Sequence, residues 1–164
     1  MPKIDIASAP ERKGSGYPAP FDKPCALRVR KQLGDAAGLI DFGVNLLRLP
    51  PGTWSSQRHW HDREDEFVYV VAGEVVLVTG AGETRLVAGD CAGFPKNAPD
   101  GHHLVNRGTR DALLLDVGDR TAGDEVDYSD IDMVVRWVDG EERYLRKDGE
   151  PYVGRARKAE SDPV

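Results

Sequence analysis

The sequence predicts an all-β protein, built as one antiparallel double-stranded β-helix close to a jelly roll, over about residues 39–118. Short runs of β-branched and aromatic residues recur about every ten residues along this part of the chain. Glycine-containing turns separate the runs, and no stretch shows the 3.6-residue apolar period of a helix. Together these observations favour a barrel or sandwich of short strands.

Composition limits the class of protein. The chain has 164 residues, of which 40% are hydrophobic and 30% charged, so one domain with tails can bury a core. The formal net charge of -6 argues against a nucleic-acid partner and against an anionic membrane, because both attract basic surfaces. No apolar run approaches the roughly 20 residues that cross a bilayer.

Residues 1–38 are predicted to form an N-terminal arm. Proline and mixed charge disfavour regular structure at its start, whereas residues 25–33 have the composition of a strand and residues 34–38 that of a turn. The N-terminus lacks the apolar segment of a secretory signal. Cys25 and Cys91 form no CxxC motif, so we expect two reduced thiols, Cys91 in a buried strand, and a cytoplasmic location.

The first barrel strands are bounded by proline and glycine. Residues 39–49, LIDFGVNLLRL, end at two prolines, which a β-ladder does not accommodate. Residues 66–72, EFVYVVA, form the next strong strand. Gly73 begins a tight turn, and residues 74–79, EVVLVT, are expected to return beside residues 66–72 as a hairpin.

Glycines divide the rest of the barrel. Gly80, Ala81 and Gly82 form the next hairpin turn, followed by a strand at residues 83–88. Further strands are expected at residues 91–94, 102–106 and 112–118.

Residues 119–164 are predicted to form a C-terminal extension that packs on the barrel or on a partner subunit. Residues 119–130 are acidic and loop-like, residues 131–138 form an apolar strand, and Asp139-Gly140 turns it into a hairpin. Residues 155–164 are expected to fray. Because the apolar residues of the arm and of this strand have no place inside a full barrel, and an open sheet edge needs cover, we expect a homodimer.

The four histidines of the chain predict a metal site. His59 and His61 lie one residue apart, so in an extended strand both side chains point to the same face. A bend at Asp62-Arg63 would return Glu66 to the same point. Two imidazoles and one carboxylate form a metal-ligating set. The alternative is a pocket that has these residues and holds no metal.

The third imidazole comes from His102 or His103. Neighbouring residues of a strand point to opposite faces, so only one of the two reaches the site. Trp60 alternates with His59 and His61 and is expected to face away from the metal, into packing. Glu64 and Asp65 flank the site as turn residues, which leaves no general base placed by the pattern.

The motifs resemble those of the cupin superfamily. Gly52, His59, His61, Glu66 and Gly73 match the first cupin motif, with one extra residue between Gly52 and His59. The second motif is matched by Gly89, Pro95, His102 and Asn106, with a loop two residues longer than is usual between Pro95 and His102. The resemblance covers about residues 40–118 and implies a cupin barrel there.

The resemblance also implies a ligand set. It assigns one divalent metal ion, Zn, Fe, Mn, Ni or Co, to His59, His61, Glu66 and His102, with His103 as the substitute for His102. The segments FGVNLLRLPPG, EDEFVYVVAGE and GHHLVNR resemble small single-domain bacterial cupins labelled sugar-phosphate-isomerase-like. A fold and a label do not establish a reaction.

Three function classes follow for a small-molecule substrate or ligand. The first is a metal-dependent isomerase or epimerase of a sugar or sugar phosphate, with the metal as Lewis acid. The second is an iron-dependent dioxygenase, and the third a non-catalytic carbohydrate-binding protein. Arg48, Arg58 and Lys96 are candidates to bind an anionic substrate near the barrel mouth, against the alternative that each is a solvated surface charge.

Overall fold

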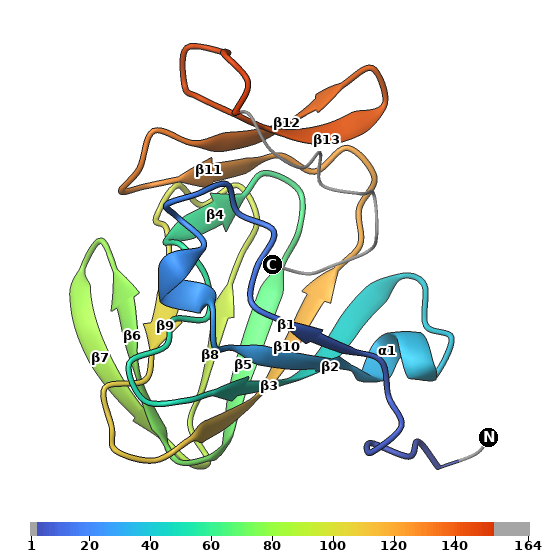
Figure 1. The fold of residues 1–164 in the computed structure, drawn as a ribbon, viewed down its shortest axis with the longest axis vertical. Coiled ribbons are helices and arrows are strands. Elements are labelled where there is room, and N and C mark those ends of the chain that lie inside the picture. The colour runs from blue at the N-terminus through green and yellow to red at the C-terminus, as the bar shows by residue number, and fades with distance from the viewer. Residues whose placement is uncertain (1–2, 153–164) are drawn as a thin grey trace.

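The fold is almost entirely β (Figure 1). The computed structural model describes residues 3–152. Within them lie strands β1 to β13, one 3-10 helix, η1 (Lys23–Cys25), and one short helix, α1 (Leu33–Ala36). The predicted all-β class is confirmed. Residues 34–38 were predicted as a turn, but residues 34–36 lie in α1, and only residues 37–38 form a turn.

Three antiparallel sheets make up the fold. The six-stranded sheet has the order β1 (Glu11–Lys13), β2 (Val29–Gln32), β3 (Phe42–Leu49), β10 (Ala112–Asp119), β5 (Glu66–Ala72) and β8 (Cys91–Phe94). The three-stranded sheet has the order β7 (Gly82–Val87), β6 (Glu74–Thr79) and β9 (His103–Val105). The four-stranded sheet has the order β13 (Glu141–Leu145), β12 (Val134–Val138), β11 (Val126–Tyr128) and β4 (His59–His61).

The main core lies between the six-stranded and three-stranded sheets. Strand β3 alternates buried and less buried residues along its length, as a strand with one face on the core does. Its inward residues Leu47 and Leu49 pack with Val70, Val75 and Leu114, all at most 2% exposed. This apolar layer fixes the register of β5 and β3, and therefore the direction in which Glu66 points.

Gly73 does not close a hairpin, and the predicted pairing of residues 66–72 with residues 74–79 is wrong. Strand β5 pairs with β10 and β8, whereas β6 pairs with β7 and β9. The chain crosses between sheets at Gly73, whose φ of 79° favours glycine. A sequence pattern shows the strands and the turn but not which sheet each strand joins. The β6–β7 hairpin is confirmed.

Part of the N-terminal arm joins the six-stranded sheet, and one of the two cysteines lies on that sheet. Strands β1 and β2 extend the six-stranded sheet beyond β3. Both thiols are free, but Cys25 is buried and Cys91 is exposed. The predicted burial of Cys91 is therefore wrong. Cys91 lies opposite Tyr69 on the outward face of that sheet, and Tyr69 is 40% exposed.

The C-terminal strands hold the segment that carries two of the histidines. The predicted β12–β13 hairpin is confirmed, but β11 forms within residues 119–130, which were expected to be loop. Strand β11 pairs on one side with β12 and on the other with β4. A second core of Tyr128, Met133 and Val135 packs against Tyr17 of the arm. The predicted fraying at residues 155–164 lies outside the described residues.

Candidate metal centre

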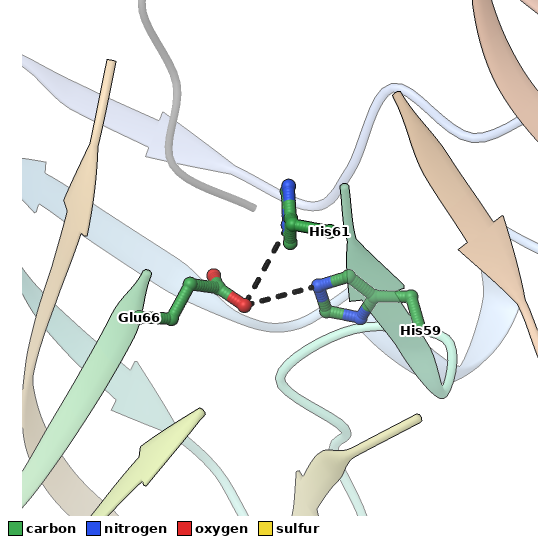
Figure 2. A group of neighbouring side chains, drawn as sticks. All are labelled: His59, His61 and Glu66. Carbon is green, nitrogen blue, oxygen red and sulfur yellow. Dashed lines mark ion pairs between the residues drawn. The ribbon is translucent and has the colours of Figure 1, made fainter. Parts of the chain in front are cut away.

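Strand β4 presents His59 and His61 to one side, as the alternation predicted. The two side chains are buried, with residue exposures of 1% and 4%. The chain then bends at residues 62–63 and enters β5 at Glu66, which is 8% exposed. Figure 2 shows the three side chains converging from two strands. The alternation along β4 and the bend before β5 therefore bring two imidazoles and one carboxylate together.

The converging atoms fit a metal ion. Glu66 Oε2 lies 3.5 Å from His59 Nε2 and 3.6 Å from His61 Nε2 (Figure 2). All three atoms are buried, and none has a hydrogen-bond partner among the described residues. Buried polar atoms without partners are costly unless something binds them. Two nitrogens and one oxygen within a few ångströms are a donor set for a divalent transition metal.

The hydrogen bonds of the Nδ1 atoms fix the tautomers of His59 and His61. His59 Nδ1 lies 2.8 Å from the carbonyl oxygen of Gln57, and His61 Nδ1 lies 2.6 Å from Oδ2 of Asp124. A carbonyl or carboxylate oxygen only accepts hydrogen bonds, so each Nδ1 carries the proton and donates it. The lone pair of each imidazole is then on Nε2, which points at Glu66.

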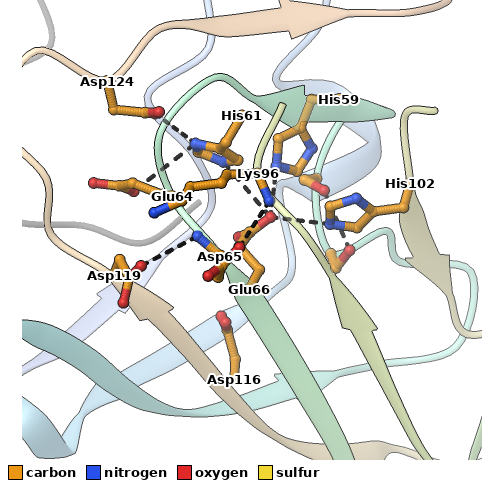
Figure 3. A network of polar contacts seen from close by, with 12 residues as sticks. His59, His61, Glu64, Asp65, Glu66, Lys96, His102, Asp116, Asp119 and Asp124 are labelled. Atoms are coloured by element: carbon orange, nitrogen blue, oxygen red, sulfur yellow. Dashed lines mark hydrogen bonds and ion pairs between the residues drawn. The ribbon is translucent and has the colours of Figure 1, made fainter. Parts of the chain in front are cut away.

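His102 and His103 face different surroundings. His102 Nε2 lies 3.0 Å from Glu66 Oε2 (Figure 3). The ring of His102 stacks on Phe94, with centroids 3.4 Å apart. His103 Nδ1 lies 3.1 Å from the carbonyl oxygen of Ser56, and its ring meets Trp54 edge-on. The structure therefore brings His102, and not His103, to the other three predicted ligands.

The pKa shifts follow from burial and from these neighbours. Burial lowers the pKa of His59 to about 4, and Glu66 offsets this only in part. Burial also acts to lower the pKa of His61, but the carboxylates of Glu66 and Asp124 outweigh it and raise that pKa. Burial acts to raise the pKa of Glu66, and the adjacent histidines outweigh it and hold that pKa well below its usual value. The shifts at His59 and Glu66 favour the forms that ligate metals, a neutral imidazole and an ionised carboxylate.

Two more carboxylates lie behind His61. Glu64 Oε2 is 3.8 Å from His61 Nδ1, and Glu64 and Asp124 surround that nitrogen (Figure 3). Burial, with the nearby charge of Asp124, raises the pKa of Glu64 to about 7. The backbone N–H of Thr121 donates to Glu64 Oε1 at 2.6 Å. Glu64 is thus a largely buried carboxylate, fixed by a hydrogen bond from the backbone, and not a solvated turn residue.

A cavity of about 320 Å³ opens beside the cluster. Its volume lies in the range of small-molecule sites. It is lined by apolar, acidic and imidazole side chains: Trp60, His61, Glu64, Glu66, Leu77, Thr79, Ala92, Gly93, Phe94, Pro95, Ala98, Asp100 and His102. Trp60 lines this cavity, so the expectation that it faces away into packing is wrong.

Arg48, Arg58 and Lys96 do not line the cavity. Arg48 pairs with Asp111 at 2.9 Å on the surface. Arg58 donates two hydrogen bonds to Asp130, at 2.8 and 2.6 Å. Lys96 is exposed, and its backbone N–H donates to Asp65. The structure does not bring these three predicted substrate-binding residues to the site.

Inside the barrel, a buried ion pair lies below the cluster. Arg30 Nη2 lies 3.0 Å from Asp116 Oδ2, with side-chain exposures of 5% and 11%. Burial raises the pKa of Asp116 to about 6, with Arg30 acting in the opposite direction. Asp116 lines a small second cavity together with Glu66, His59 and His102 (Figure 3). Nothing in the motifs pointed to this pair.

Sequence reasoning missed Asp124 and Asp100, and placed Glu64 only beside the site. Asp124 reaches His61 because β11 pairs with β4, a contact between residues more than sixty positions apart. Asp100 reaches the cavity rim because its Oδ1 accepts the backbone N–H of Gly80 at 2.6 Å. The only signal available was that the segment carrying Asp124 is acidic.

No helix among the described residues is long and apolar enough to span a bilayer. No functionally curated protein matches the chain.

Comparison with known proteins identifies the family. Residues 45–118 match the family model described as a cupin domain. A solved cupin-superfamily protein from Silicibacter pomeroyi, named a sugar phosphate isomerase, is 47% identical, with 93% of this chain and 97% of that chain covered and a TM-score of 0.88. A protein from Acidithiobacillus ferrooxidans with a provisional sugar phosphate isomerase name is 31% identical, with 88% and 91% covered and a TM-score of 0.73. The chain belongs to the cupin superfamily.

Proposed function

We propose that this cupin binds one divalent metal ion through His59, His61, Glu66 and His102, and isomerises or epimerises a small sugar-type carbonyl compound. One observation carries the proposal. The Nε2 atoms of His59 and His61 and Oε2 of Glu66 are buried without hydrogen-bond partners among the described residues, and His61 and Glu66 lie at the wall of a cavity large enough for a small molecule. His102 adds a fourth donor 3.0 Å from Glu66.

The donor set suits Zn, Fe, Mn, Ni or Co. When bound, such an ion supplies a Lewis acid at the cavity wall. Gln57 and Asp124 hold the two imidazoles of β4 in the orientation that binding needs, because they accept the Nδ1 protons.

Glu64 supplies the base that the motifs lacked. It lines the cavity next to His61, and its Oε1 is held by the backbone N–H of Thr121. Its Oε2 is then the atom that accepts a proton from one substrate carbon and returns it to the neighbouring carbon. Trp60 and Phe94 give the cavity apolar walls, which keep water from the transferred proton.

The relatives support the same reaction class. The two solved proteins above carry sugar phosphate isomerase names, and the first covers nearly the whole of this chain. Their names describe those proteins, and the transfer to this one is part of the proposal.

Proton exchange tests the proposal directly. Chelator-treated protein is loaded with Zn, Mn, Fe or Ni, and a panel of free and phosphorylated aldoses and ketoses is followed by proton NMR in deuterium oxide. We expect interconversion, or deuterium incorporation next to the carbonyl, for at least one pair, and loss of both in Glu64→Gln. Asp62→Asn is the matched control, because Asp62 is a neighbouring acid outside the cavity lining.

The same samples separate the other two function classes. Oxygen uptake by the iron-loaded protein without sugar interconversion would replace the proposal with a dioxygenase. Saturable sugar binding without any exchange, for every metal, would replace it with a binding protein.

We also propose that the protein is a homodimer. The outward face of β5 carries Phe67, Tyr69 and Val71, which are 43%, 40% and 44% exposed. Three apolar side chains in a row on the middle of a sheet are typical of a covered face. A second copy is the partner that every solution of this protein contains. A cytoplasmic location and the lack of a nucleic-acid partner stay predictions from the sequence.

A further inference from the structure

The cavity beside the histidines is acidic. Glu64, Glu66 and Asp100 line it, and none of the lining residues in the described part of the chain is lysine or arginine. A cavity that binds a phosphate group normally supplies guanidinium or ammonium groups, because these compensate the phosphate charge and donate charge-assisted hydrogen bonds. The charge of this lining therefore bears on the kind of sugar that it accepts.

Two arginines near the site, Arg58 and Arg30, are occupied elsewhere. Arg58 is held by two hydrogen bonds to Asp130 and by one to the carbonyl oxygen of Gly101, at 3.4 Å. Arg30 is paired with Asp116 in the barrel interior, outside the cavity lining. Neither guanidinium is directed into the cavity.

Backbone donors at the cavity rim are occupied as well. Phosphates are also bound by clusters of backbone N–H groups. Here the N–H of Gly80 donates to Asp100, that of Lys96 to Asp65, and that of Asn97 to the carbonyl oxygen of His61. The loop after β8 thus presents few backbone donors to a bound anion.

A bound divalent ion does not remove the repulsion between the acidic cavity lining and a phosphate group. Glu66 compensates one of the two charges of the ion, and Asp100 and the ionised form of Glu64 add negative charge on the cavity side. A phosphate dianion placed away from the metal would lose hydration and face like charges, whereas a neutral hydroxyl would donate hydrogen bonds to the same carboxylates. Asp100 keeps one oxygen for this, because Gly80 uses only Oδ1. Trp60 and Phe94 offer apolar surface to the carbon face of a sugar.

We infer that the substrate is an unphosphorylated, uncharged polyhydroxy aldehyde or ketone, and not a sugar phosphate. The inference rests on the proposed function and adds the substrate class to it. It differs from the names of the two solved relatives.

Matched ligands test the inference by direct binding. Calorimetry and ligand-observed NMR are run on the zinc-loaded protein with free ketoses and aldoses, with their terminal phosphate esters, and with inorganic phosphate. We expect at least one free sugar to bind about tenfold or more tightly than its own ester, and inorganic phosphate to compete poorly with it. Equal or tighter binding of every ester would overturn the inference.

The experiments distinguish a failure of the inferred substrate class from a failure of the proposed function. Interconversion of an ester but of no free sugar would leave the proposed function standing and overturn the inference. Binding and exchange of neither kind of sugar would overturn the proposed function, and the inference with it.

Two variants test the electrostatic cause. Asp100→Asn keeps an oxygen for the N–H of Gly80 and removes one charge, and Ala98→Lys adds a cation to the lining. Each should shift the ratio of ester to free-sugar affinity toward the ester by about three- to tenfold. Asp111→Asn, which removes a surface carboxylate outside the lining, is the control and should leave the ratio unchanged. Unchanged ratios in both Asp100→Asn and Ala98→Lys would overturn the proposed electrostatic cause.

Discussion

Nδ1 of His61 donates a hydrogen bond to Oδ2 of Asp124 across 2.6 Å, between the histidine strand and the loop that enters β11. Asp124 is held in turn. The backbone N–H of Arg63 donates to its Oδ1 at 2.8 Å, and the indole N–H of Trp137 donates to its carbonyl oxygen at 3.1 Å. The carboxylate therefore orients the imidazole and does not simply neutralise it.

Asp124→Asn is expected to weaken metal binding while the protein stays folded. An amide cannot stabilise the N–H of His61 as a carboxylate does, so Nε2 becomes a poorer ligand. The expected loss of affinity for zinc is about tenfold or more, measured by competition with a chromophoric chelator. Asp127→Asn is the control, because Asp127 lies on β11, just after the loop that carries Asp124, and pairs with Arg136. Equal affinities in the two variants would contradict the orienting role of Asp124.

The two adjacent histidines are expected to behave differently. His102→Ala should abolish stoichiometric zinc binding, because Nε2 of His102 lies 3.0 Å from Glu66. His103→Ala should bind a full equivalent, because Nδ1 of His103 is directed to the backbone of Ser56. Elemental analysis after dialysis measures both. The reverse result would mean that the metal uses the other face of this strand.

The pair Arg30–Asp116 gives a pH dependence of stability. Burial raises the pKa of Asp116 to about 6, above its value in the unfolded chain. Protonation of Asp116 therefore stabilises the folded state, and this contribution is lost as the pH rises from about 4 through about 6. Relative to Asp116→Asn, the wild type should lose about 1–3 kcal/mol of unfolding free energy over that window.

Urea titrations of the chelator-treated proteins at several pH values measure this difference. If the attraction of Arg30 outweighs burial, the wild type will instead gain stability over the variant as the pH rises.

The outward face of β5 is expected to form the dimer interface. Light scattering should give twice the chain mass of 18.0 kDa for the wild type. Tyr69→Lys places a charge in the proposed interface and should yield monomers. Ile40→Lys is the control, because Ile40 is 79% exposed and lies outside that face. A monomeric wild type at micromolar concentration would rule out this dimer.

Two motif glycines with the same backbone angle should respond differently to alanine. Gly73 and Gly52 have φ of 79° and 77°. A Cβ at Gly73 would lie 2.8 Å from the carbonyl oxygen of Asp111, whereas one at Gly52 meets nothing within 4 Å. Gly52→Ala should cost about 1 kcal/mol of stability for the angle, and Gly73→Ala clearly more. Equal losses of stability in the two variants would mean that the backbone around Gly73 can shift to make room for a Cβ.

The parts of the site that the sequence predicted are those fixed by local geometry. Alternation along β4 placed His59 and His61 on one face, and a bend of two residues returned Glu66 to them. Asp124 could not be found in this way, because its position depends on the pairing of β11 with β4. The hairpin at Gly73 failed for the related reason that a turn signal does not specify the next strand's partner.

The pairing of β11 with β4 has a consequence for the newly made chain. Synthesis runs from the N-terminus, so His59, His61, Glu66 and His102 leave the ribosome before residues 124–128. Until those residues follow, the three-residue histidine strand lacks its neighbour in the sheet, and His61 lacks the acceptor for its Nδ1 proton. An incomplete chain therefore lacks the carboxylate that orients His61, and the centre is complete only when β11 has paired with β4.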